Sequence, residues 1–203
     1  MFHDLRRLPW RLRYIHGSRV ATEARRALIR ATHSHANIQI GRPVRLGPGF
    51  ELDVPASGTF TVGSGVDFRR GFKCEISGDG RVVIGPGTVF TSYALIQCST
   101  LIEILPRSQI GQSVLIVDGN HRFRDWTKHM FAQGYDYKPI TIGPAAIIYG
   151  NSTVVASVGK RSVIGANSVV TRDVPAYCLA AGAPARIIEY FGPPELRPPE
   201  LDE

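Results

Sequence analysis

Apolar residues recur every six positions through most of this 203-residue chain, from about residue 38 to residue 170. A period of six fits neither the 3.6-residue turn of an α-helix nor the two-residue alternation of a strand. It is the length of one short strand plus one turn, and hexapeptide periods are typical of a parallel β-helix. The pattern therefore predicts an all-β solenoid with one inward-pointing apolar side chain per repeat. The predicted inward residues are Ile40, Leu46, Leu52, Val62, Phe68, Cys74, Ile84, Phe90, Ile96, Ile102, Ile104, Ile110, Ile116, Ile142, Ile148, Val154, Val158, Ile164 and Val170.

Glycine directly follows many of these apolar residues, at positions 41, 47, 63, 85, 111, 143, 159 and 165. Every strand of a solenoid must be followed by a turn, and glycine tolerates tight turn geometry. The spacing is irregular in two places, with a two-residue offset at Ile102–Ile104 and a four-residue step at Val154–Val158. These offsets predict turns that are lengthened or cut.

The formal charge of +7 is concentrated at the N-terminus. Residues 1–30 hold eight arginines and two acids, whereas the rest of the chain holds sixteen basic and fifteen acidic residues. The main domain is therefore close to neutral, and its charge argues against nucleic acid as a partner.

Residues 1–36 are predicted to form a basic helical extension. A second helical stretch is expected at about residues 20–31, and Pro9 would end or kink a helix unless it lies in the first turn. Two interpretations stay open: a cap over the open end of the solenoid, or a basic amphipathic segment that contacts an anionic membrane or a partner. The apolar residues at helical spacing before this stretch are Leu5, Leu8, Leu12 and Ile15.

No apolar run is long enough for a membrane span, and the N-terminus lacks the apolar region of a signal peptide. The chain has three widely separated cysteines, Cys74, Cys98 and Cys178. Their number and spacing suggest neither a disulfide framework nor a metal site. We therefore expect a cytoplasmic protein, at the inner membrane surface if its N-terminus contacts lipid.

The repeat is interrupted at residues 118–140, an excursion loop that begins Asp118-Gly119-Asn120-His121-Arg122. Loops carried on a regular scaffold often hold the chemistry. An imidazole titrates near neutral pH, so His121 is the candidate general base.

The stretches 142–148, 158–175 and 181–186 resemble the C-terminal half of the hexapeptide-repeat acyltransferases, which include sugar, serine and streptogramin-type O-acetyltransferases. The match covers roughly residues 38–190. This resemblance implies a left-handed β-helix, a homotrimer with active sites between subunits, and acetyl-CoA as co-substrate without a metal. The left hand rests on the resemblance alone, because strand crossovers are normally right-handed.

The sequence departs from the family pattern in the last coils. Ile147-Ile148-Tyr149 stands where an aromatic-Ile-Gly is common, and the coil at 154–159 is two residues short. Both differences concern the wall of the coenzyme tunnel.

The resemblance also assigns roles to loop residues. His121 is the expected base, and its orienting acid is Asp118 in preference to Asp125. Asp125 would instead face the acceptor or pair with Arg122, and Asn120 would help to hold the acceptor. Trp126 and the other loop aromatics either stack on the acceptor or form a small cluster that fixes the loop. These other aromatics are Phe123, Phe131, Tyr135 and Tyr137.

The coenzyme and the oxyanion are expected further along the solenoid. The backbone N–H of Gly150 is the expected oxyanion donor. Ala166 and Arg186 would contact coenzyme A, with Lys160 or Arg161 as phosphate partners.

The sequence thus predicts an O-acetyltransferase that acts on a hydroxyl of a sugar or glycan precursor. A streptogramin-type antibiotic acetyltransferase and a non-catalytic scaffold are the alternatives. A γ-type carbonic anhydrase is disfavoured, because a zinc-ligating histidine five positions after His121 would fall on Trp126. The predicted domain limits are 1–36 for the extension, 37–188 for the β-helix and 189–203 for a Pro-rich acidic tail.

Overall fold

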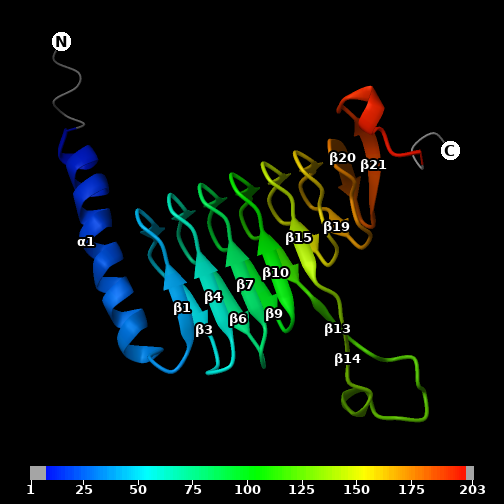
Figure 1. Ribbon diagram of the computed structural model, residues 1–203, viewed down its shortest axis with the longest axis horizontal. Coiled ribbons are helices and arrows are strands. Elements are labelled where there is room, and N and C mark those ends of the chain that lie inside the picture. Colours follow the sequence, from blue (N-terminus) through cyan, green and yellow to red (C-terminus); the bar gives the residue numbers. More distant parts are fainter. Residues whose placement is uncertain (1–7, 200–203) are drawn as a thin grey trace.

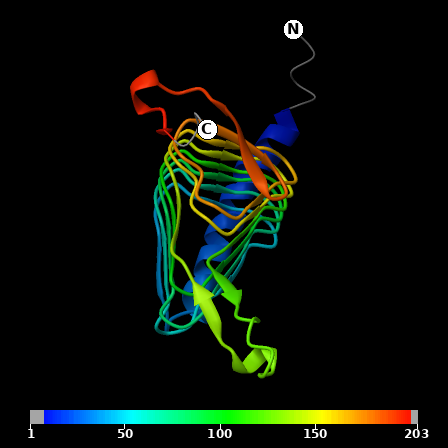
Figure 2. The same ribbon diagram turned by 90° about the vertical axis from the view of Figure 1, so that its right-hand side faces the viewer.

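The computed structural model describes residues 8–199, with side-chain surroundings from residue 19 onward. The chain winds into a parallel β-helix of stacked coils with roughly triangular cross-section (Figures 1 and 2). Each full coil contributes one strand to each of three parallel sheets, so the predicted all-β solenoid is confirmed.

The strands of the three sheets follow one another in a fixed rotation. The first sheet contains β1 (Asn37–Ile40), β4 (Thr59–Val62), β7 (Arg81–Ile84), β10 (Leu101–Ile104) and β15 (Ile140–Ile142). The second contains β2 (Arg45–Leu46), β5 (Asp67–Phe68), β8 (Val89–Phe90), β11 (Gln109–Ile110), β16 (Ile147–Ile148), β18 (Val163–Ile164), β20 (Cys178–Gly182) and β21 (Ala185–Tyr190). The third contains β3 (Glu51–Asp53), β6 (Lys73–Ile76), β9 (Leu95–Cys98), β12 (Leu115–Val117), β17 (Thr153–Val154) and β19 (Val169–Val170).

The core is the column of side chains inside the coils. The predicted inward residues are buried there, apart from Ile40 and Leu52 of the first coil, which are partly buried. Four phenylalanine rings pack together in the N-terminal part of this column, and those of Phe68 and Phe90 stack at 5.0 Å between centroids. The other two, Phe50 and Phe72, pack against them.

Most of the glycines that follow the inward residues serve close stacking rather than turn conformation. A Cβ atom on Gly47, Gly143 or Gly159 would collide with the backbone of the next coil, and none of the three has a positive φ. The left-handed turn positions come two residues later, as at Gly49 and Gly65. The turn role predicted for these glycines is therefore corrected, because the spacing between coils is what excludes a side chain.

The N-terminal helix is continuous, where the sequence suggested two helical stretches. α1 runs from Leu8 to Thr32, and Pro9 lies in its first turn. A proline there interrupts no intrahelical hydrogen bond, which explains why it does not break the helix. The residues before Leu8 lie outside the described part of the chain.

Helix α1 lies against the first coil (Figure 1) and covers its unpaired backbone edge. Arg26, which is 3% exposed, donates from Nη1 to the Ile40 carbonyl at 2.8 Å. Arg25 donates to the Leu46 carbonyl at 3.0 Å, and the Thr22 hydroxyl accepts from the Leu46 N–H at 3.2 Å. An open sheet edge exposes such groups to pairing with another chain, so these contacts are those of a cap.

The C-terminal end closes differently. β20 pairs with β21 as an antiparallel hairpin, and a short helix, η2, follows at Pro194–Leu196. β21 and η2 extend into residues 189–203, the predicted Pro-rich tail, and the sequence did not reveal them because the antiparallel pairing lies outside the hexapeptide pattern. The acidic residues 200–203 lie beyond the described part of the chain. No helix among the described residues is both long and apolar enough to cross a membrane.

We expect the aromatic column to be a main source of stability. Replacing Phe90, which is fully buried, by alanine should lower the free energy of unfolding by about 3–5 kcal/mol, because a cavity remains. Phe131→Ala is the matched control, since that ring is 77% exposed, and should change it by less than about 0.5 kcal/mol. Urea titration measures both values. Equal losses would contradict the packing described for Phe90.

Candidate active site

The excursion loop is a structured arm, defined here as residues 118–139. β13 (Gly119–His121) and β14 (Tyr135–Tyr137) pair as an antiparallel hairpin, and a short helix, η1 (Met130–Ala132), lies near its tip. The arm leaves the solenoid after β12, at the corner between the third and first sheets, and projects away from the coils (Figure 2). This corner is where an insertion interrupts no ladder of strands.

His121 ends the outgoing strand of the arm and is exposed. Its register partner is Tyr135, and the two rings lie 4.3 Å apart between centroids. The ring of Phe131 is also near, at 6.0 Å. The arm aromatics thus include a cluster around the imidazole. Trp126 stands apart from this cluster with 92% of its surface exposed.

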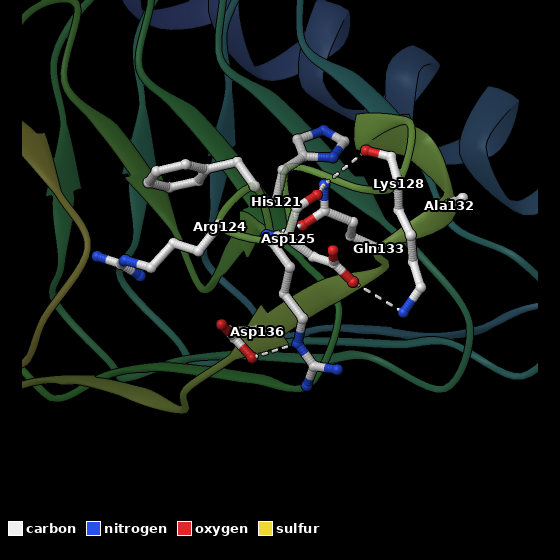
Figure 3. Close-up of a pocket in the computed structure, with 9 residues that line it drawn as sticks. His121, Arg124, Asp125, Lys128, Ala132, Gln133 and Asp136 are labelled. Carbon is white, nitrogen blue, oxygen red and sulfur yellow. Dashed lines mark hydrogen bonds and ion pairs between the residues drawn. The ribbon is translucent and has the colours of Figure 1, made fainter.

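A pocket of about 400 Å³ adjoins His121 (Figure 3). Its lining contains two ion pairs: Arg122 Nε to Asp136 Oδ1 at 2.6 Å, and Lys128 Nζ to Asp125 Oδ2 at 2.9 Å. Arg124 extends to the opposite side of the pocket from Lys128. The lining combines an imidazole, three cations and two carboxylates, so it offers many hydrogen-bonding groups to a polar ligand. The lining residues are His121, Arg122, Phe123, Arg124, Asp125, Lys128, Ala132, Gln133 and Asp136.

Asp125 organises the turn at the tip of the arm. Its Oδ1 accepts from the Thr127 hydroxyl at 2.5 Å and from the Thr127 N–H at 3.1 Å. The hydrogen bond from Thr127 and the ion pair with Lys128 lower the pKa of Asp125. The suggested pairing of Asp125 with Arg122 is wrong, because Arg122 binds Asp136 across the hairpin.

Asp118 is buried at the base of the arm, with 4% of its surface exposed. Its Oδ1 accepts from the Ser99 N–H at 2.8 Å, and its Oδ2 accepts from the Thr100 N–H at 2.7 Å and the Thr100 hydroxyl at 2.8 Å. Cys98 Sγ adds a contact at 3.5 Å. Burial and the Asp118 charge raise the pKa of Cys98 to about 12, so this thiol stays protonated.

The structure therefore does not bring Asp118 to the imidazole. Within the described residues, no hydrogen bond joins Asp118 to His121, because the preceding coil occupies both carboxylate oxygens. The contacts of Asp118 are those of an anchor for the outgoing strand. Asn120 lies beside His121 on β13, exposed and opposite Asp136.

The pocket contains residues that the sequence reading did not single out. Gln133 bonds the backbone of Asp125 in both directions, at 3.0 Å each, and closes the loop. Asp136 lines the pocket because it lies opposite Asn120 in the hairpin. The alternation Tyr135-Asp136-Tyr137 was the available signal for that second strand.

The residues predicted for the coenzyme do not gather in one place within the chain. Gly150 and Ala166 lie on successive coils at the corner between the second and third sheets, where Asn167 N–H donates to the Gly150 carbonyl at 3.0 Å. Lys160 and Arg161 lie at the corner between the first and second sheets. Arg186, on β21, lines a pocket of about 700 Å³ at the C-terminal end. All except Gly150 are exposed.

The described residues contain no group of three or more His, Cys, Asp or Glu side chains arranged to hold a metal ion.

The chain is similar to several acetyltransferases of known sequence or structure. No protein-family model matches the chain. A probable acetyltransferase of Mycobacterium tuberculosis is 35% identical over 89 residues, which are 40% of this chain and 30% of that protein. Galactoside O-acetyltransferase of Escherichia coli is 47% identical over 53 residues, which are 25% of this chain and 26% of the enzyme. The matches thus span less than a third of these relatives.

Solved structures match over most of the chain. A hexapeptide-repeat acetyltransferase of Vibrio cholerae, complexed with acetyl coenzyme A, has a TM-score of 0.59 and 25% identity, covering 84% of this chain and 78% of its own. A mutant of AntD, an N-acyltransferase from Bacillus cereus in complex with dTDP and coenzyme A, has a TM-score of 0.66 and 17% identity, covering 81% and 87%. The fold is the left-handed parallel β-helix, as expected.

The anchoring role of Asp118 can be separated from a role on the imidazole. Asp118→Ala should lower the free energy of unfolding by about 1–3 kcal/mol, because the partly buried N–H groups of Ser99 and Thr100 lose their acceptor. The control Asp136→Ala removes an exposed ion pair and should cost less than about 1 kcal/mol. Chemical denaturation measures both. If Asp118→Ala were as stable as the control but inactive, the anchoring role would be contradicted and Asp118 would be the acid that orients His121.

Proposed function

The relatives of this chain are hexapeptide-repeat acetyltransferases, and we propose that the protein transfers an acetyl group from acetyl-CoA to a hydroxyl of a sugar or glycan precursor. The observation that carries the proposal is His121, an exposed imidazole beside a polar pocket on a structured arm of this fold. Relatives of known specificity include a galactoside O-acetyltransferase and a sugar N-acetyltransferase, so amines are the rival acceptors.

His121 acts as the general base in the proposed reaction. Its neutral ring nitrogen takes the proton of the acceptor hydroxyl as the oxygen attacks the thioester carbonyl. The Gly150 N–H, which donates no hydrogen bond within the described residues, is the proposed donor to the oxyanion. As the carbon–sulfur bond breaks, the imidazolium returns the proton to the leaving thiolate. No covalent enzyme intermediate is needed.

The acceptor lies in the arm pocket in this proposal. Asn120, Asp125 and Trp126 remain the proposed contacts, with the exposed indole as a face for a sugar ring. Asp125 contributes through the turn that it holds together as well as through its charge.

The proposal includes a homotrimer with active sites between subunits. The arm carries Phe131 and Trp126 at 77% and 92% exposure, which are large apolar surfaces for a chain on its own. The corner of Lys160 and Arg161 differs from that of Gly150 and Ala166, so one coenzyme contacts both sets most simply when they come from neighbouring subunits. Arg186 is proposed as a further coenzyme contact. Three free, buried cysteines agree with a reducing cytoplasm.

The decisive experiment is release of free thiol from acetyl-CoA with a panel of sugars, nucleotide sugars, amino sugars and streptogramins. His121→Ala should reduce kcat by about 10²–10⁴-fold, the usual share of general-base catalysis. His129→Ala is the matched control and should retain activity within about threefold, since this second arm histidine caps η1 and does not line the pocket.

Each result decides between readings. Thiol release that requires His121 and a hydroxyl acceptor supports the proposal. Thiol release that requires an amino sugar would show N-acetylation instead of O-acetylation. Equal rates for His121→Ala and wild type would remove His121 as the base. Absence of both turnover and acyl-CoA binding would favour a non-catalytic scaffold.

A further inference from the structure

The four-residue step at Val154–Val158 changes the solenoid where the arm returns to it. Within residues 8–199 the first sheet has no strand after β15, and it is continued there only by the single bridges Ile142 to Val158 and Val158 to Val174. Side chains replace the missing backbone partners. Ser157 Oγ accepts from the Thr141 N–H at 3.1 Å, and Asp173 Oδ1 accepts from the Ser157 N–H at 2.9 Å.

Lys138 reaches this shortened corner from the returning end of the arm. Its Nζ lies 2.9 Å from both carboxylate oxygens of Asp173. Its backbone N–H donates to the Asp118 carbonyl at 2.9 Å, opposite the buried anchor of the outgoing strand. The hydrogen bond from Lys138 lowers the pKa of Asp173.

The arm depends on such contacts at its base because it has no core of its own. None of the residues of η1 or β14 is buried, and each hairpin strand has three residues. A two-stranded hairpin of this size is at best marginally stable in water. The position of His121 relative to the coils is therefore set by what holds the two ends of the arm.

We propose that Lys138 and Asp173 are a positioning pair, which fixes the arm, and with it His121, against the last coils of the solenoid. The pair complements Asp118, so the outgoing strand is held to the preceding coil and the returning strand to the coil that carries Ala166. The catalytic part of this inference rests on the proposed function. Neither residue touches the reacting atoms.

Three variants test the pair. Lys138→Met keeps the stem and removes the charge, Lys138→Arg keeps the charge, and Asp173→Asn keeps an acceptor for the Ser157 N–H. The matched control is Arg42→Met, because Arg42 and Glu23 form an ion pair at 2.9 Å at the far end, with 64% and 54% exposure against 62% and 56% for Lys138 and Asp173.

We expect Lys138→Met and Asp173→Asn to lower kcat by about tenfold or more, because small misplacements of a catalytic group are costly. The KM for acetyl-CoA and the Tm should stay close to wild type. Lys138→Arg should restore most of kcat, and Arg42→Met should behave as wild type. Hydrogen exchange at residues 119–122 and 135–138 should accelerate in Lys138→Met and not in Arg42→Met.

The outcomes separate this inference from the proposed function. Exchange and kcat in Lys138→Met equal to those in Arg42→Met would overturn the positioning pair. Faster exchange with unchanged kcat would also overturn it, since the base would then not need the anchor. If the wild-type protein transferred no acyl group, the proposed function would be wrong. Hydrogen exchange alone would then decide whether Lys138 holds the arm.

Discussion

The in-register hydrogen bonding between successive coils is the constraint on which the rest of the molecule depends. Each strand pairs with the strand at the same position of the next coil. The backbones approach so closely that no side chain fits at positions 47, 143 and 159, which are glycines. An insertion within a strand would interrupt its pairing with the strands of the neighbouring coils, whereas an insertion at a corner leaves that pairing intact. The arm therefore emerges at a corner, where its sequence can vary without disturbing the scaffold.

The two ends of the solenoid face a different requirement, because a coil with only one neighbour exposes its backbone. At the N-terminal end α1 supplies side chains, including the buried Arg26, to the carbonyls of the first coil. At the C-terminal end β21 turns back along β20 and pairs with it. Both solutions lie outside the hexapeptide pattern.

This difference explains how far the sequence could be read. The inward side chains, from Leu46 to Val170, were predictable because each coil repeats the environment of the one before. The continuity of α1, the β20–β21 hairpin and the partners of Asp118 were not, since they depend on contacts between segments without a period. His121 was identifiable as a candidate from its place in the interruption. Asp118 follows Ile116, the last inward residue before the arm, by two positions. It could not be assigned to the coil or to the arm without its contacts to the neighbouring turn at Ser99 and Thr100.

The buried cysteines have a chemical consequence for a protein that would handle a thiol product. Thiol–disulfide exchange requires a thiolate on the attacking side and access to it. Burial raises the pKa of Cys74, Cys98 and Cys178, that of Cys98 to about 12, and all three lie inside the solenoid. Coenzyme A released beside the coils would therefore meet no cysteine thiolate ready to form a mixed disulfide with it.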